Sequence, residues 1–291
     1  MSIIGLDIGG TKIKGILVDD SGKIIYSKKI FIEDLNHKQI ISELTYIIKF
    51  LIGISKQKVQ TIGISICGIV QEGKLISTGV GLNDLKGKNL KKSIQTKFNL
   101  PVIIENDANC FALAESVKGK YSKYINLVGV IWGTGVGSGI IINQEIYSGS
   151  KGGAGEIGKL KVPILIDSQT KQSYNIEHLC GGKYMKKSYG KNILPSKIFD
   201  LKDVVAKKIS QIALSAMAWS IANLINTLNP DVIVLGGGMS NISKTTYTKL
   251  KKEVKKYCMP ELFSSTKIYK YSISDDAGAL GAVILAKKLN Q

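Results

Sequence analysis

The sequence contains no arginine: all 40 basic residues are lysine, against 22 acidic residues, which leaves a formal charge of +18. Such a charge would suit a nucleic-acid-binding protein. However, arginine makes the bidentate contacts to guanine and phosphate that dominate specific readout, and the lysines are spread along the whole chain. We therefore interpret the lysines as solvated helix faces and expect no nucleic-acid partner. The absence of arginine also excludes an arginine finger from this chain or from an identical subunit.

Long apolar runs and paired cysteines are absent as well. No run approaches the roughly 18 apolar residues that a membrane helix requires. Residues 2–6 are strand-like, so we expect no secretory signal. The four cysteines form no Cys-x-x-Cys pair, so we expect no disulfide framework and a reducing, cytoplasmic compartment. With 291 residues, of which 44% are apolar, the chain is long enough for one large domain or two.

The order of the apolar segments predicts an α/β protein whose second half repeats the plan of the first. Each half is expected to begin with a strand, a glycine turn and a second strand, followed by amphipathic helices and buried strands. We predict strands at 2–8, 12–19, 23–31, 60–66, 102–104, 123–132, 140–142, 231–235 and 266–270, and helices at 37–52, 89–98, 201–228 and 243–257. The expected domains are residues 1–110 and 111–276, with a last helix at about 277–291 packing back onto the first.

The first candidate site is the segment Asp7-Ile8-Gly9-Gly10-Thr11-Lys12. An acidic residue ends an apolar strand and two glycines make a tight turn, where backbone N–H groups can approach an anion closely because glycine has no Cβ. Asp7 would suit Mg²⁺, directly or through water, since this ion prefers oxygen ligands and retains water. A simple hairpin turn would explain the same residues.

A second glycine turn, Gly-Thr-Gly-Val-Gly-Ser-Gly, occupies residues 133–139 between two predicted strands. It lacks the Gly-Lys-Ser/Thr of a P-loop, and it does not open a helix as a dinucleotide fingerprint does. Its amides could cradle a phosphate, with the Thr134 hydroxyl as an additional donor.

Acidic and amide side chains supply the other candidates. Asn106 and Asp107 follow a predicted strand at its carboxyl end, where α/β sites occur. A carboxylate there could accept a hydroxyl proton and an amide could bind a sugar hydroxyl, although either residue could instead cap the next helix. Glu156 is a lone acid among small residues, which favours a functional loop. Glu177 and His178 follow a polar segment, and His178 taken alone is more typical of a surface histidine than of a metal ligand.

Two further segments complete an ordered set of motifs: Leu-Gly-Gly-Gly-Met-Ser at residues 235–240 and Asp-Ala-Gly-Ala-Leu-Gly-Ala at residues 276–282. In this order, the motifs resemble those of the sugar kinase, heat-shock protein 70 and actin superfamily, and within it the ROK family of sugar kinases and related repressors. The resemblance covers about residues 2–288. It implies an α/β fold of two actin-like (ribonuclease H-like) domains with a cleft between them.

The resemblance also implies roles for the matching residues. Asp107 matches the catalytic base. The nucleotide and phosphate motifs are matched by Asp7, Gly9, Gly10, Thr11, Lys12, Gly133, Thr134, Gly135, Gly137, Gly236, Gly237 and Gly238. The family's sugar contacts are matched by Asn83, Asn106, Glu156 and Glu177.

The sequence departs from the family pattern at two places. Lys159 stands where the family has a sugar-contacting histidine, so we expect that contact to pass to Lys159, to pass to His178, or to be missing. The family's CxCGxxGC zinc cluster usually follows, but residues 162–176 contain no cysteine. We therefore expect no structural zinc and a loop that other contacts organise.

The function implied by the resemblance is ATP-dependent phosphorylation of a hexose or N-acetylhexosamine, at O6, with Mg²⁺ near Asp7 and Asp107 as general base. Glucose, N-acetylmannosamine, N-acetylglucosamine and fructose stay open as substrates, and polyphosphate stays open as a donor. The alternative is a sugar-sensing regulator that has lost catalysis. The expected partners are a sugar and a nucleotide, with no membrane, and a homodimer would fit the family.

Overall fold

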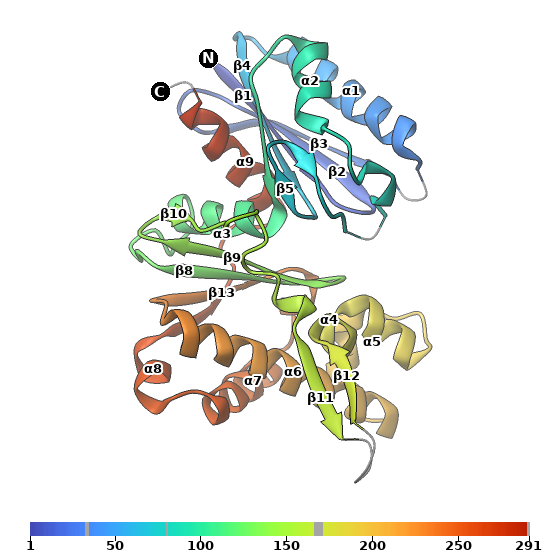
Figure 1. The fold of residues 1–291 in the computed structure, drawn as a ribbon, viewed down its shortest axis with the longest axis vertical. Helices are drawn as coiled ribbons and strands as arrows, with labels where there is room; N and C mark the ends of the chain where they lie inside the picture. The colour runs from blue at the N-terminus through green and yellow to red at the C-terminus, as the bar shows by residue number, and fades with distance from the viewer. Residues whose placement is uncertain (33–34, 80, 166–170, 290–291) are drawn as a thin grey trace. The chain divides into compact units, whose positions relative to one another are not determined.

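In the computed structural model the chain forms two compact units, and the structure describes all residues except 33–34, 80, 166–170 and 290–291. The first unit comprises Met1–Lys120, Glu145–Ala154 and Ile273–Gln291, and the second comprises Tyr121–Gln144 and Gly155–Ser272. Each contains a mixed β-sheet covered by helices (Figure 1), so the predicted α/β class is confirmed. Among the described helices, none combines the length and the apolar character needed to cross a membrane.

The first unit is built around one five-stranded sheet. Its elements are β1 (Ser2–Ile8), β2 (Lys12–Val18), β3 (Ile24–Phe31), α1 (His37–Ile54), β4 (Val59–Ile66), β5 (Val70–Gln71), β6 (Lys74–Leu75), the 3-10 helix η1 (Asn83–Leu85), α2 (Leu90–Phe98), β7 (Val102–Asn106), α3 (Asp107–Val117), β10 (Glu145–Ile146) and α9 (Ala277–Lys288).

The strand order in this sheet is β3-β2-β1-β4-β7. Strands β1, β4 and β7 are parallel to one another, whereas β2 is antiparallel to both β1 and β3. Side chains alternate between the two faces of a strand, so Ile4, Leu6 and Ile8 of β1 join a core shared with α1 and α2. Ile3 lies on the opposite face, in a cluster with α9. This alternation also directs Asp7 of β1 toward α9.

Helix α9 packs closely on this second face because glycines occupy the contact points (Figure 1). A Cβ added to Gly5 of β1 would lie 2.4 Å from the carbonyl oxygen of Ala279, and one added to Gly63 of β4 would lie 2.0 Å from that of Ala282. Real Cβ atoms essentially never approach so closely. The carboxyl-terminal helix therefore belongs to the first unit through contacts that only glycine permits at these two positions.

The second unit contains the remaining elements. They are β8 (Leu127–Trp132), β9 (Val136–Ile142), η2 (Ile157–Lys159), β11 (Lys161–Leu165), β12 (Lys171–Asn175), α4 (Ile176–Cys180), α5 (Gly182–Tyr189), η3 (Pro195–Asp200), α6 (Val204–Leu228), β13 (Val232–Gly236), η4 (Gly238–Ser240), α7 (Lys244–Tyr257), α8 (Pro260–Ser265) and β14 (Lys267–Lys270).

Four strands of this unit lie in the order β9-β8-β13-β14. β9 is antiparallel to β8, while β8, β13 and β14 are parallel. The first unit has the same pairing in β2-β1-β4-β7, so the predicted internal repeat is confirmed. The long helix α6 begins at the cap Asp203, whose side chain accepts from the Ala206 amide, and ends at Asn229 in a left-handed conformation.

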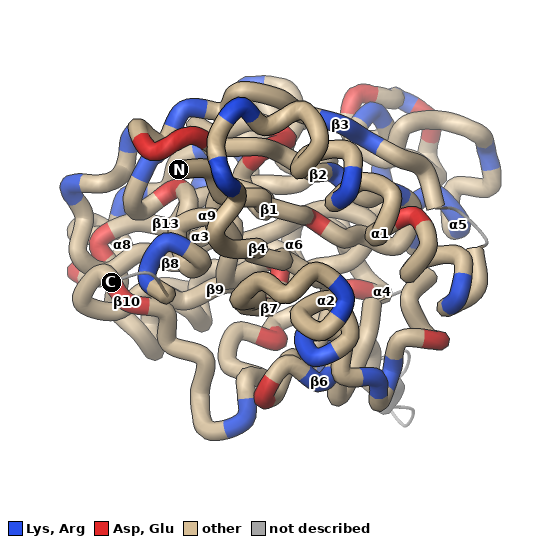
Figure 2. The backbone as a smooth tube through the Cα atoms, turned by 90° about the horizontal axis from the view of Figure 1, so that it is seen from above, with Lys and Arg blue, Asp and Glu red and all other residues tan. Residues whose placement is uncertain are grey.

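Lysines occur on elements of both units, as the blue segments in Figure 2 show. Helix α7 illustrates their placement, because its buried residues are Thr246, Leu250 and Val254 while Lys251, Lys252 and Lys255 lie outside that set. An amphipathic surface helix has this distribution. Lys14 of β2 is an exception, with only 8% of its surface exposed, and its partners are described below.

Candidate active site

A row of polar side chains crosses the first unit's sheet on the face covered by α9. Asp7 of β1 is level with Ser65 of β4, and Ser65 is level with Glu105 of β7. The buried Ser65 hydroxyl donates to Asp7 Oδ1 over 2.6 Å. Glu105 Oε1 accepts from the backbone N–H of Asn106 (2.7 Å) and from Asn109 Nδ2 (3.0 Å). Parallel pairing therefore places the Asp7 and Asn106-Asp107 motifs at the same edge of one sheet.

Asp7 is held beneath the first turn of α9. A Cβ on Gly278 would lie 2.5 Å from Asp7 Oδ1, so the carboxylate is pressed against the backbone there. Burial raises the pKa of Asp7, and the Ser65 hydrogen bond and the charge of Lys12 only partly oppose this rise. A nearby divalent cation would favour the ionised form of such a carboxylate. The role of Asp7 near Mg²⁺ stays a prediction.

Asn106 is the residue that caps α3. Its Oδ1 accepts from the amides of Ala108 (2.8 Å) and Asn109 (3.1 Å), and its Nδ2 donates to Gly68 O (3.0 Å) and Asp107 Oδ1 (3.1 Å). These four hydrogen bonds use the donors and acceptors of a side-chain amide. The predicted contact of Asn106 with a sugar would therefore replace one of them.

Asp107 is the first residue of α3, and its Oδ1 also accepts from the Ala108 amide over 3.0 Å. A negative side chain at a helix N-terminus interacts favourably with the helix dipole. Because Asn106 both caps the helix and donates to Asp107, the cap fixes the orientation of the carboxylate.

The first glycine turn joins β1 and β2 as a hairpin, closed by a hydrogen bond from the Gly9 amide to Lys12 O over 3.0 Å, and its role in phosphate binding stays a prediction. The segment that leads into η1 lies against it. A Cβ on Gly81, which has a φ of +87°, would lie 2.4 Å from Gly10 O. The exposed Asn83 begins η1 two residues later. The structure thus brings the Asn83 segment and the first glycine turn together within this unit.

Lysines of β2 and β3 converge on the two aspartates that precede α9. Lys12 Nζ lies 2.7 Å from Asp275 Oδ1, Lys29 Nζ lies 2.7 Å from Asp275 Oδ2, and Lys14 Nζ lies 2.6 Å from Asp276 Oδ1. Partial burial raises the pKa of Asp275, but the hydrogen bonds from Lys12 and Lys29 outweigh it and lower the pKa to about 2. This cluster ties the start of α9, and hence Gly278 above Asp7, to the sheet.

In the second unit, the Gly133–Gly135 turn is hydrogen-bonded to the junction of α4 and α5. The amides of Gly182 and Lys183 donate to the carbonyl oxygens of Gly133 (2.9 Å) and Thr134 (3.1 Å). The buried Trp132 ring donates from Nε1 to Cys180 O over 2.7 Å. Gly237, with a φ of +80°, packs where a Cβ would lie 2.4 Å from Trp132 O. The second glycine turn and the Gly236–Gly238 motif thus form one block.

Three charged side chains gather beside this block. Lys159 forms an ion pair with Glu177. The other oxygen of Glu177 lies 3.0 Å from the position that a Cβ on Gly135 would take. Burial raises the pKa of the nearby Glu156, an effect that Lys159 opposes and Glu177 reinforces. The structure therefore brings Glu156, Lys159 and Glu177 together next to the second glycine turn.

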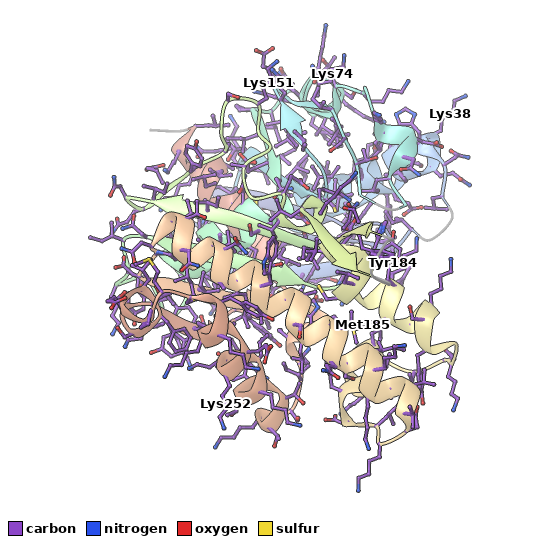
Figure 3. The ribbon with its side chains drawn as sticks, turned by 60° about the horizontal axis from the view of Figure 1, so that its bottom comes forward. Lys38, Lys74, Lys151, Tyr184, Met185 and Lys252 are labelled. Atoms are coloured by element: carbon purple, nitrogen blue, oxygen red, sulfur yellow. The ribbon has the colours of Figure 1, made fainter. Side chains whose placement is uncertain are left out.

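His178 takes a different direction. Its exposed ring packs on Tyr184 of α5, with 4.2 Å between the ring centres (Figure 3 labels Tyr184). Side chains of adjacent helix residues point about 100° apart, so His178 and Glu177 contact different residues. Lys159, and not His178, is the residue that the structure pairs with Glu177.

Comparison with known proteins identifies the family. The ROK family model matches residues 3–289. The chain belongs to the ROK family. It is 29% identical to an N-acetyl-D-glucosamine kinase of Histophilus somni, over 97% of both chains. It is 30% identical to the xylose repressor of Bacillus spizizenii, over 96% of this chain and 75% of the repressor. A structure described as a putative N-acetylmannosamine kinase from Listeria monocytogenes superimposes with a TM-score of 0.84 and 27% identity, over the full length of both chains.

The zinc cluster expected of many ROK proteins does not fit the residues present here. The segment that would carry it contains no cysteine, and β11 and β12 pair there as an antiparallel hairpin, from Lys161 opposite Asn175 to Leu165 opposite Lys171. Residues 166–170, within the expected cluster, lie outside the described residues. In the described part of the chain, no three His, Cys, Asp or Glu side chains are grouped as metal ligands.

For three residues of this candidate site, sequence reasoning did not predict the neighbours that the structure shows. Ser65 and Glu105 lie in apolar strands, and only the pairing of β1, β4 and β7 shows that they share a row with Asp7. The third is Gly278, whose position above Asp7 depends on how α9 packs. The alternation of Ser65 with Ile64 and Ile66 was the available signal, because a polar residue on a buried strand needs a partner.

Proposed function

We propose that this protein transfers the γ-phosphoryl group of ATP to a hydroxyl group of a hexose or N-acetylhexosamine, with O6 as the acceptor. One observation carries the proposal: Asp7 and the Asn106-Asp107 pair stand at the carboxyl ends of parallel strands in a single sheet. Ligands of open α/β sheets bind at this edge. A general base and a phosphate-motif acid built on one rigid sheet hold a fixed spacing, which phosphoryl transfer requires.

In this proposal the first unit supplies the proton acceptor. Asp107 takes the proton from the attacking hydroxyl, and a base of this kind typically contributes about 10²–10⁴ in rate. Asp7 would hold Mg²⁺, most simply through water, and the ion would supply charge neutralisation of the phosphates when bound. Backbone amides of the first glycine turn would orient the transferred group.

The second unit supplies the nucleotide and sugar contacts in this proposal. Amides of the turn at Gly133, Thr134 and Gly135 would bind phosphate, and the Gly236–Gly238 segment would lie against the nucleoside. Glu156 and Glu177 would accept hydrogen bonds from sugar hydroxyls. The hydrogen-bonded block of turn, α4–α5 junction and Gly237 supports this division, because it connects the second glycine turn, Gly237 and the helix that carries Glu177.

A sugar-sensing regulator without catalysis is the second candidate. Two observations favour considering it: the 30% identity with a xylose repressor and the presence of Lys159 in place of the family histidine. A sensor would bind sugar without turnover.

The test is a coupled assay with ATP and with polyphosphate against glucose, N-acetylmannosamine, N-acetylglucosamine and fructose. We expect turnover of at least one sugar with ATP, a loss of about 10²-fold or more in kcat for Asp107→Asn, and a near-normal sugar Kd by calorimetry. Asp20→Asn, an exposed turn residue, serves as the matched control. Sugar binding without turnover would establish the sensor instead, and near-normal turnover by Asp107→Asn would refute the assignment of the base.

A further inference from the structure

At the base of the β11–β12 hairpin, the strand register brings two oppositely charged side chains together. Its first pair is Lys161 opposite Asn175, and the ladder continues one step further through a hydrogen bond from the Ile176 amide to Leu160 O over 3.0 Å. The next residues outward are Lys159 and Glu177, which form the ion pair. The pairing of β11 with β12 therefore positions the Lys159 ammonium next to the Glu177 carboxylate.

Glu177 is the better buried partner of this pair. Its side chain is 16% exposed, whereas that of Lys159 is 59% exposed. A carboxylate with so little contact with water needs a compensating partner. Glu156 adds a second carboxyl group nearby; burial raises its pKa, Lys159 opposes this rise and Glu177 reinforces it. Lys159 forms an ion pair with Glu177 and also interacts electrostatically with Glu156.

The position of Glu177 is constrained from the other side by the second glycine turn. One of its oxygens lies 3.0 Å from where a Cβ on Gly135 would be, and its carbonyl accepts from the Gly181 amide over 2.8 Å. Residues Gly182 and Lys183 then hydrogen-bond the turn itself. A displaced Glu177 carboxylate would thus move within a packed block that also carries the proposed phosphate contacts.

We propose that Lys159 is a positioning residue that acts through Glu177: together with the β11–β12 hairpin, it fixes this carboxylate for the sugar without a structural metal ion. The inference rests on the proposed function only in taking Glu177 as a sugar contact. In this proposal Lys159 does not contact the sugar in place of the family histidine, because its ammonium group already donates to the Glu177 carboxylate.

The experiment compares Lys159→Met, Lys159→Arg and the control Lys161→Met, an exposed lysine two residues away at the start of the same hairpin. Sugar affinity is measured by calorimetry, KM is measured for sugar and for ATP, and the metal content of the purified protein is determined. We expect Lys159→Met to weaken sugar binding about tenfold, equivalent to about 1.4 kcal/mol. The KM for ATP should stay within about twofold. Lys159→Arg should restore binding because it keeps the cation, and Lys161→Met should behave as the wild type.

A double variant separates a positioning role from a direct contact. If Lys159 acts through Glu177, then Lys159→Met in a Glu177→Gln background should add little further loss of sugar affinity, because contacting residues are non-additive. Full additivity, an unchanged sugar affinity in Lys159→Met, or one equivalent of bound zinc would overturn the inference. A wild type that binds sugar without turnover would refute the kinase proposal and leave this test intact.

Discussion

Replacing glycine by alanine should have opposite effects in two helices of the first unit, and the contrast tests how α9 holds Asp7. Gly53 is the penultimate residue of α1, and a Cβ there would meet nothing within 4 Å. Gly278 is the second residue of α9, and its Cβ would lie 2.5 Å from Asp7 Oδ1 and 2.6 Å from Asp7 Cγ. Both changes improve helix propensity, by at most about 1 kcal/mol.

At Gly278, the clash of the added Cβ with Asp7 makes the substitution destabilising. Overpacking costs about 1–3 kcal/mol, and Asp7 cannot retreat without lengthening its 2.6 Å hydrogen bond from Ser65, which as a bond to a charged group contributes about 1.5–3 kcal/mol. We expect Gly278→Ala to lose about 1–3 kcal/mol net and Gly53→Ala to gain up to about 1 kcal/mol. At about 2–4 °C per kcal/mol for a chain of this size, Tm should fall by roughly 2–12 °C in the first variant and stay level or rise in the second.

The assay is thermal unfolding of both variants beside the wild type, with the Mg²⁺ dependence of turnover as a second readout. If Asp7 serves the metal, Gly278→Ala should also need more Mg²⁺ for half-maximal rate, whereas Gly53→Ala should not. A Tm for Gly278→Ala at or above that of the wild type, with unchanged Mg²⁺ dependence, would refute the packing of α9 onto Asp7.

Two further predictions concern the same unit. The folded-state pKa of Asp275, about 2, lies below its ordinary value of 3.8, so its ionised form stabilises the fold above about pH 4 and that contribution disappears as the pH falls through 2. Asp275→Asn should therefore lower Tm at pH 6, with a deficit that shrinks as the pH falls toward 2; an equal deficit at pH 6 and pH 2 would contradict the ion cluster. Glu105→Ala should lower the urea midpoint, because it leaves Asn109 Nδ2, on a residue 1% exposed, without its acceptor, at a cost of about 1–3 kcal/mol; an unchanged midpoint would show that the polar row adds nothing to stability.

Secondary structure was largely readable from the sequence because apolar periodicity and glycine turns are local signals. The predicted helix at 201–228 is α6 (Val204–Leu228), and the predicted strand at 60–66 is β4 (Val59–Ile66). The hairpin of β11 and β12 was missed, since Lys171–Asn175 has no alternating apolar pattern and its pairing partner supplies the register.

The candidate residues were predictable as types, but their partners were not. Asn106 and Asp107 were both plausible helix caps, and only the backbone geometry shows that Asn106 caps α3 while orienting Asp107. Likewise, Lys159 and His178 were both candidates for the sugar contact of the missing family histidine, and that contact stays a prediction. What the structure adds is their neighbours: Lys159 pairs with Glu177, whereas His178 packs on Tyr184.

The sequence by itself determined the α/β class, the repeated strand–turn–strand plan, the absence of arginine chemistry and the lack of cysteine ligands where a zinc cluster would stand. These are properties of residue type and local spacing. Tertiary structure alone decided which distant residues are in contact. These contacts are the row of Asp7, Ser65 and Glu105, the packing of α9 against Gly5 and Gly63, and the ion pair of Lys159 with Glu177. Each depends on strand register or on close backbone approach between segments far apart in the chain, which no local pattern of residues encodes.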